Sequence, residues 1–139
     1  MKKENWIWMP HVAHFCCGDR CQFRLATYVG KYIVSTVGDW WPSRSSREIH
    51  AKVYDKEWLY INEHLKGDDF DYAYLKEFGY TDVGCDRKYE TMVFKAKKSK
   101  QNCCPWEMKS CENLDMDGYN LPTDARKGHM RLCDKWSKK

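Results

Sequence analysis

The clearest alternation of apolar and polar side chains lies in three short stretches. QFRLATYV and YIVSTV are rich in β-branched and aromatic residues and are separated only by Gly30 and Lys31. Two such runs around a glycine-containing turn predict a β-hairpin over residues 22–37. YETMVFKA, at residues 89–96, alternates in the same way and predicts a further strand.

Helical spacing is clearest near the end of the chain. Ala125, His129, Cys133 and Trp136 recur at intervals of three and four residues, as the buried face of a helix does. Pro122 stands just before this segment, a position at which helices often begin. We therefore predict a C-terminal helix over residues 123–136.

Two further helices are expected in the middle of the chain. A serine at the first position can cap a helix over residues 43–54, in which Ile49 and Val53 share one face. An aspartate can cap a second helix that begins at residue 68 or 69, and Gly79 is placed to end it. The run WLYINEHL, residues 58–65, fits either a strand or a helix.

The remaining segments have weaker patterns. Residues 1–10 are expected to pack loosely or to form a short strand. The segment after the 89–96 strand is predicted to be a loop of about 25 residues that holds Cys103, Cys104 and Cys111. A loop of that length inside a compact domain needs an anchor, and thiols near its start offer one.

Composition suits one compact domain spanning residues 1–139. The hydrophobic fraction is 42% and the charged fraction 32%, which indicates a folded core with a solvated surface. The formal net charge of +4 permits an acidic or nucleic-acid partner without requiring one. No export signal and no membrane-spanning run are visible, so we expect no membrane association and a reducing, cytoplasmic location.

Eight cysteines in such a compartment are better explained as thiols or metal ligands than as disulfides, although a secreted disulfide scaffold is the alternative. The strongest candidate is HVAHFCCGDRC, residues 11–21, because imidazole and thiolate are the ligands that zinc prefers. Four ligands in so short a loop are crowded, so a distant thiol, Cys103 or Cys104, is expected to complete the shell. The predicted ligands are therefore His11, His14, Cys17, Cys21 and Cys104. The alternative is that the histidines lie on the surface and the cysteines are small buried hydrophobes.

The other chemistry-bearing residues are ambiguous. His129 and Cys133 lie four apart on one helical face and fit either a second metal site or a core histidine beside a buried thiol. Cys85 stands alone in a turn and Cys111 in a loop, without a signature of a nucleophile. The sequence therefore assigns no catalytic residue. It favours a protein that is not an enzyme and leaves open whether the chain has catalytic activity.

Two surface predictions remain. Arg44, Arg47, Lys95, Lys97, Lys98 and Lys100 are candidate anion or nucleic-acid contacts. A plain solvated surface explains the same residues. The pair Trp40 and Trp41 is a candidate protein-contact hot spot if exposed, and part of the core if buried.

Four segments taken together, PHVAHFCC…CQF, IVSTVGDW, GCDRKYETMVFKA and GYNLPTDARKGHMRLCDKW, resemble small uncharacterised proteins encoded by tailed phages and prophages. The YETMVF strand and the Gly128–His129 pair of the last helix are the most specific part of that resemblance. It implies a phage accessory protein that works in the cytoplasm of a bacterial host. It carries over no catalytic residue.

We therefore predict an α+β fold: a small antiparallel sheet with two or three helices on one face and an N-terminal loop tied by a structural zinc ion. The function expected first is a non-enzymatic protein that inhibits or redirects a host protein or ribonucleoprotein complex, for example in anti-defence of the anti-CRISPR type. A nucleic-acid-binding module with a basic loop is the second possibility. A metal-dependent hydrolase, which would need an open coordination position, is the third.

Overall fold

A computed structural model describes residues 1–14, 20–54, 68–84 and 86–139. The predicted ligand Cys17, the thiols Cys16 and Cys85, and the ambiguous run 58–65 lie outside these residues. By its internal contacts the chain forms two compact units, where the sequence predicted one domain. The sheet unit comprises residues 1–40 and 82–139, and the helical unit comprises residues 41–81.

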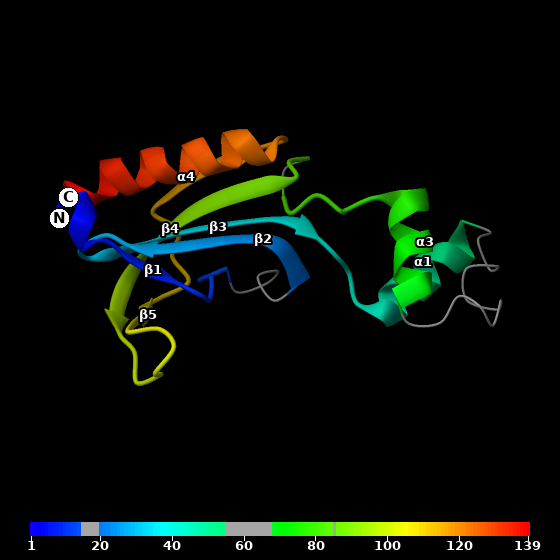
Figure 1. Ribbon diagram of the computed structural model, residues 1–139, viewed down its shortest axis with the longest axis horizontal. Helices are drawn as coiled ribbons and strands as arrows, with labels where there is room; N and C mark the ends of the chain where they lie inside the picture. Colours follow the sequence, from blue (N-terminus) through cyan, green and yellow to red (C-terminus); the bar gives the residue numbers. More distant parts are fainter. Residues whose placement is uncertain (15–19, 55–67, 85) are drawn as a thin grey trace. The chain divides into compact units, whose positions relative to one another are not determined.

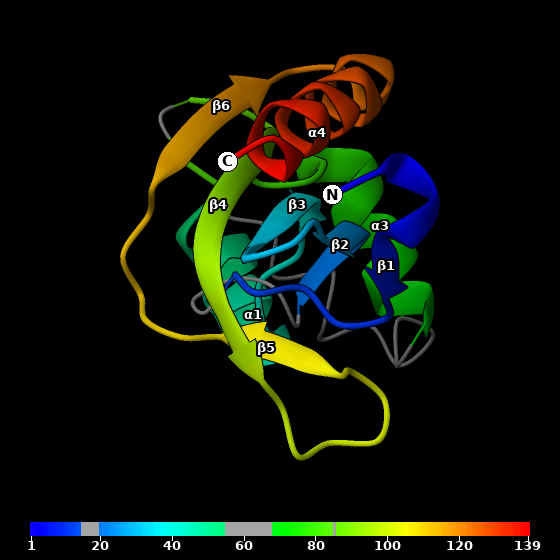
Figure 2. The ribbon, with the colours of Figure 1, turned by 90° about the vertical axis from the view of Figure 1, so that its left-hand side faces the viewer.

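The sheet unit is built on one six-stranded antiparallel sheet. Its strands are β1 (Ile7–Met9), β2 (Cys21–Tyr28), β3 (Tyr32–Trp40), β4 (Tyr89–Lys98), β5 (Trp106–Met108) and β6 (Asp115–Tyr119). Strands β1 to β5 follow one another in space, and β6 also pairs with β4. Figure 2 shows β1 to β5 below the helix α4, Pro122–Ser137, and β6 to the side of that helix. The predicted α+β class is confirmed.

The hairpin predicted over 22–37 corresponds to β2 and β3, which pair from Cys21 opposite Trp40 to Tyr28 opposite Ile33. Its turn places Gly30 at a φ of 101°, a conformation that costs glycine little and other residues much. The strand predicted over 89–96 runs two residues further, as β4. The helix predicted over 123–136 is α4, with one extra residue at each end.

Helix α4 covers one face of the sheet, and the two chain ends lie side by side at the end of this layer (Figure 1). The face predicted from its periodicity is the buried one, since Ala125, His129 and Cys133 are all fully buried. His129 forms two hydrogen bonds in the core. Its Nε2 lies 2.8 Å from the hydroxyl of Thr27, and its Nδ1 lies 2.7 Å from the hydroxyl of Thr36. The oxygen of Thr36 lies 2.7 Å from that of Thr91, so a polar chain crosses the core.

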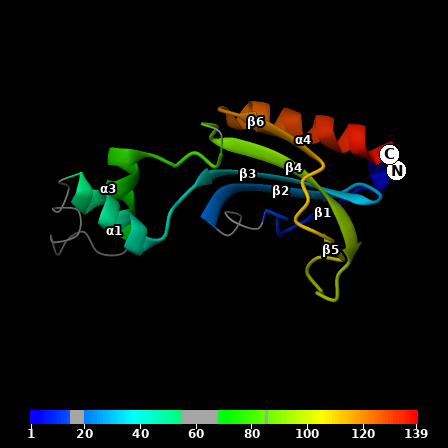
Figure 3. The same ribbon diagram turned by 180° about the vertical axis from the view of Figure 1, so that it is seen from behind.

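The prediction of a 25-residue loop after β4 is wrong, because this segment contains β5 and β6. Both strands pair with β4, at residues 96–98 and 89–93 respectively, and Figure 3 shows the long connection between them from behind. The sequence of β6, DMDGY, is poor in strand-forming residues. Contacts from α4 hold it instead: Arg131 pairs with Asp117, and Trp136 Nε1 donates to Asp115 at 2.9 Å.

The helical unit contains α1 (Arg44–Val53) and α3 (Asp68–Phe78). Ser43 caps α1 as predicted, because its hydroxyl accepts a hydrogen bond from the backbone N–H of Ser46. Ile49 and Val53 share a face, and that face is exposed, at 65% and 72%. Within the described residues, no helix is long and apolar enough to cross a membrane.

Among the described residues, those packed in the apolar cluster on the sheet face opposite α4 include none from a helix. This cluster consists of Met9, Ala26, Tyr28, Ile33 and Cys104, with partly buried neighbours such as Trp106. The cover comes from two irregular segments, residues 10–14 after β1 and residues 99–105 between β4 and β5. These two segments carry the candidate site.

Candidate metal centre

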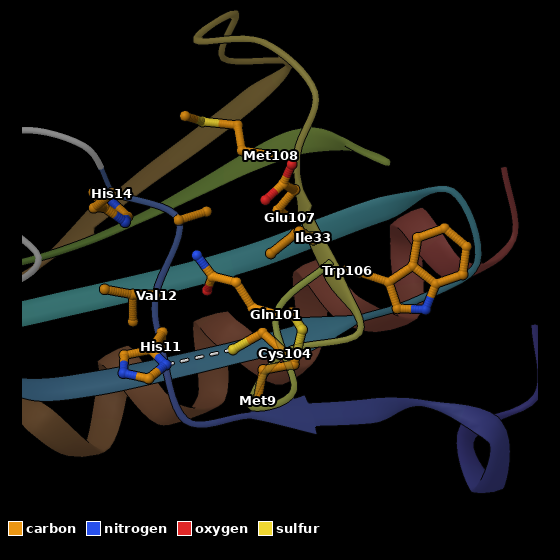
Figure 4. Close-up of a pocket in the computed structure, with 11 residues that line it drawn as sticks. Met9, His11, Val12, His14, Ile33, Gln101, Cys104, Trp106, Glu107 and Met108 are labelled. Carbon is orange, nitrogen blue, oxygen red and sulfur yellow. Dashed lines mark hydrogen bonds between the residues drawn. The ribbon is translucent and has the colours of Figure 1, made fainter. Parts of the chain in front are cut away.

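One histidine and two cysteines from these irregular segments lie together. The ligand atoms of His11, Cys103 and Cys104 are all within 4.8 Å of one another, a spacing at which they could hold a metal ion. The Sγ atom of Cys104 lies 3.5 Å from Nδ1 of His11, as the dashed line in Figure 4 marks. Cys104 is buried, whereas His11 and Cys103 are exposed. Metal-donor residues from two segments that are far apart in the sequence therefore meet on one face of the sheet.

Local structure explains this meeting. Pro10 directly follows β1, and because proline has no backbone N–H the strand cannot continue to pair there. His11 is thus turned out of the sheet. On the other side, the backbone N–H of Ser99 donates to the carbonyl of Pro105 at 3.0 Å and closes the β4–β5 connection. Cys103 and Cys104 are held within that closed loop.

Burial decides the chemistry of the Cys104 thiol. Desolvation raises the pKa of Cys104, since its thiolate would be poorly hydrated beneath the loop. A metal ion reverses this preference, because it binds the thiolate directly and releases the proton. Metal affinity at this cluster is therefore expected to increase with pH.

A cavity of about 630 Å³ adjoins the cluster, with His11 and Cys104 in its wall. The other described lining residues are Met9, Val12, Ala13, His14, Ile33, Gln101, Trp106, Glu107 and Met108. Figure 4 shows Gln101 reaching between the two irregular segments. Neither Gln101 nor Glu107 was predicted as a site residue, and a single polar residue on a short hairpin gives no signal that could have found them.

His14, predicted to be a ligand, is held by other partners. Its Nδ1 lies 2.8 Å from the hydroxyl of Ser35, and its Nε2 lies 3.2 Å from Oε1 of Glu90. Ser35 also accepts the backbone N–H of Ala13 at 3.0 Å. Both ring nitrogens thus face sheet residues, and the imidazole fixes the N-terminal segment to the sheet. We leave His14 out of the proposed ligand set for this reason.

Cys21, another predicted ligand, is 1% exposed and opens β2 opposite Trp40. Among the described residues, the group that could share one ion consists of His11, Cys103 and Cys104 and does not include it. Of the five predicted ligands, the structure brings His11 and Cys104 together and adds Cys103, the alternative distant thiol. The cluster proposed below therefore consists of His11, Cys103 and Cys104.

Comparison with known proteins gives no assignment. No family model, no curated protein and no solved structure matches this chain.

The alternative pair on α4 is part of the core. Both nitrogens of His129 are bonded to threonines, and burial lowers its pKa to about 4. Burial also raises the pKa of Cys133 to about 12, so this thiol stays protonated at neutral pH. A thiol that stays protonated is a poor nucleophile and a poor metal ligand, so this pair fits neither catalysis nor a second metal site.

The predicted arginine contacts lie in the helical unit. Arg47 is 6% exposed, forms an ion pair with Asp71, and stacks on Trp41 with its guanidinium carbon 4.4 Å from the ring centroid. This arginine therefore stabilises its own unit and offers little to an external anion. Arg44 is more exposed, and its Nε lies 3.1 Å from Oε1 of Glu48.

Trp40 and Trp41, the predicted protein-contact pair, are both half-buried.

Proposed function

We propose that this chain is a zinc-stabilised accessory protein of a phage that acts by binding, without catalysis, to a protein or ribonucleoprotein complex of its bacterial host. The observation that carries the zinc assignment is the His11–Cys103–Cys104 cluster. Imidazole and thiolate donors favour zinc over magnesium or calcium, which prefer oxygen. The ion would serve a structural purpose, since it would join two segments that have little regular structure.

The need for such a clamp follows from the layer it closes. Helix α4 covers one face of the sheet and contributes Leu132 and Cys133 to the apolar cluster there, whereas residues 10–14 and 99–105 contribute to the cluster on the other face. Irregular segments bury little apolar area and lose much conformational entropy when they become ordered. A metal ion bound by both segments would offset that loss.

The phage part of this proposal rests on the resemblance of four segments, and residues from three of them meet in the core. Thr36 belongs to IVSTVGDW, Thr91 to YETMVF and His129 to the last helix, and these three residues form the polar chain through the core. Residues that specify packing can be shared without a shared activity. The resemblance therefore implies an origin for the protein and no catalytic role.

A binding role is supported by the state of the reactive side chains. The thiol of Cys133 and the imidazole of His129 are both fully buried, and their pKa values are shifted away from nucleophilic or basic chemistry. We propose inhibition or redirection of a host machine, such as a defence complex, as the outcome of binding.

The metal part is tested by elemental mass spectrometry and a free-thiol count on the same purified sample. We expect about one zinc per chain in the native protein, and loss of that zinc in His11→Ala and Cys104→Ser. Cys111→Ser is the matched control, because Cys111 is exposed and outside the cluster. Cys17→Ser reveals whether the predicted loop cysteine supplies a further ligand. Metal-free native protein, or full zinc retention in both cluster variants, would exclude this site.

The binding part is tested by affinity capture from a lysate of the phage's host, with the zinc-loaded protein as bait. We expect a defined host complex at fixed stoichiometry that also binds when purified. A purified complex that fails to bind, or turnover of a substrate that stops on chelation while the fold persists, would replace this proposal by the hydrolase alternative.

A further inference from the structure

The excess positive charge of this protein is concentrated in one short hairpin. Residues 95–109 contain five lysines and one glutamate, and this imbalance equals the formal net charge of the whole chain, +4. The lysines are Lys95, Lys97, Lys98, Lys100 and Lys109, and all five are exposed. Among the described residues, ion pairs involve only one of them, Lys97, whose Nζ lies 3.3 Å from Glu107.

The fold adds a sixth lysine and brings together lysines that are distant in sequence. The backbone N–H of Ala96 donates to the carbonyl of Lys31, in the β2–β3 turn, at 2.9 Å. The N–H of Lys109 donates to the carbonyl of Lys95 at 2.7 Å. The backbones of three segments therefore meet at one end of the sheet, and each carries exposed lysine. By contrast, residues 41–81 contain six basic and eight acidic residues.

An aromatic ring lies on the same hairpin as five of these lysines. Trp106 pairs with Lys98 across the β4–β5 ladder and remains partly exposed. Its ring stacks on Tyr28 with centroids 4.2 Å apart and planes 3° from parallel, so its orientation is fixed. A fixed, partly exposed indole paired with one lysine on a lysine-rich hairpin suits a base and its phosphates better than it suits an acidic protein.

We propose that this lysine surface, defined as the six lysines above together with Trp106, binds single-stranded nucleic acid. The lysines would contact phosphates, and Trp106 would stack on a base. Because phosphate contacts carry no sequence information, binding is expected to depend weakly on base sequence and strongly on salt. This surface extends the predicted contacts at residues 95–100 by Lys31 and Lys109.

The same hairpin contains two of the candidate metal ligands. Cys103 and Cys104 lie in the connection between Lys100 and Trp106, so an ion bound there and to His11 would fix how the two strands present their lysines. We expect the zinc-loaded protein to bind more tightly than the chelated one. This dependence rests on the proposed zinc site, whereas the lysine surface itself does not.

The test is fluorescence anisotropy with a labelled 20-nucleotide oligothymidylate at several salt concentrations. Four phosphate contacts predict a logarithmic salt slope of about −2.8 and therefore an affinity about 50-fold lower at 200 mM than at 50 mM salt. Substituting both Lys98→Ala and Lys100→Ala should reduce that slope to about −1.4. Trp106→Ala should weaken binding about tenfold at an unchanged slope, and Trp106→Phe should retain most of it.

The matched control removes the same charge from the other unit. Lys52 and Lys76 are exposed lysines of α1 and α3, and changing both to alanine should leave affinity and slope unchanged. Three results would overturn the proposal. They are equal losses of oligonucleotide affinity in the Lys98/Lys100 and Lys52/Lys76 double variants, a salt slope near zero, and binding to polyglutamate as tight as to the oligonucleotide. If the hairpin variants lose binding while chelation has no effect, the surface stands and its dependence on zinc fails. If the native protein contains zinc and does not bind the oligonucleotide, the lysine surface fails and the zinc site stands.

Discussion

Burial of His129 should make the stability of this protein depend on pH in a defined direction. The imidazole is fully buried, and burial lowers its pKa from 6.5 to about 4, so it stays neutral in the folded chain at neutral pH. In the unfolded chain it takes up a proton near pH 6.5. The unfolded state therefore binds more protons between these two pKa values, and stability is lost as the pH falls through that range.

The magnitude follows from the difference between the two pKa values, which is about 2.5. Each pKa unit corresponds to about 1.4 kcal/mol, so this single group should remove about 3 kcal/mol of unfolding free energy by pH 4. About 2.5 kcal/mol of that loss should be present at pH 4.5. Above about pH 7 the contribution is complete and constant.

The assay is urea denaturation of the native chain and of His129→Gln at pH 7.5 and 4.5, at the same zinc concentration. Glutamine does not titrate, although it can still bond one of the two threonines. The native chain should lose about 2.5 kcal/mol more than the variant between the two pH values, because all other titrating groups are common to both. Parallel losses within about 0.5 kcal/mol would refute the reasoning, as would a His129 imidazole resonance that titrates near pH 6.5 in the folded protein.

Three further substitutions test the packing. Gly128→Ala should lower the free energy of unfolding by about 1–3 kcal/mol in thermal or urea denaturation, because a Cβ there would overlap the ring of Tyr119; unchanged stability would mean that α4 does not approach β6 so closely. Arg47→Ala should destabilise by about 3 kcal/mol, because it leaves Asp71 unpaired and uncovers Trp41. Arg44→Ala, which breaks the exposed pair with Glu48, should cost less than about 1 kcal/mol in the same assay; equal effects in the two variants would contradict the internal role of Arg47.

Local pattern was enough wherever the periodicity reflects one buried face. The β2–β3 hairpin, β4 and α4 follow from alternation or from spacings of three and four residues, and Ser43 caps α1 through its own hydroxyl. The thiol–imidazole composition was also enough to indicate a metal, because donor chemistry depends on residue type and not on the fold. The ligands predicted in this way include His11 and Cys104, which both belong to the cluster that could hold a metal ion.

Only the tertiary structure decided which donors meet. His11 and His14 are three residues apart, yet one faces a thiol brought from the β4–β5 loop, and the other faces Ser35 and Glu90 on the sheet. Likewise, β6 exists because β4 offers a free edge and α4 offers partners for its aspartates, which no local propensity predicts. Residue type and short-range period determine chemistry and element, whereas a site between distant segments depends on pairing and packing that the local sequence does not encode.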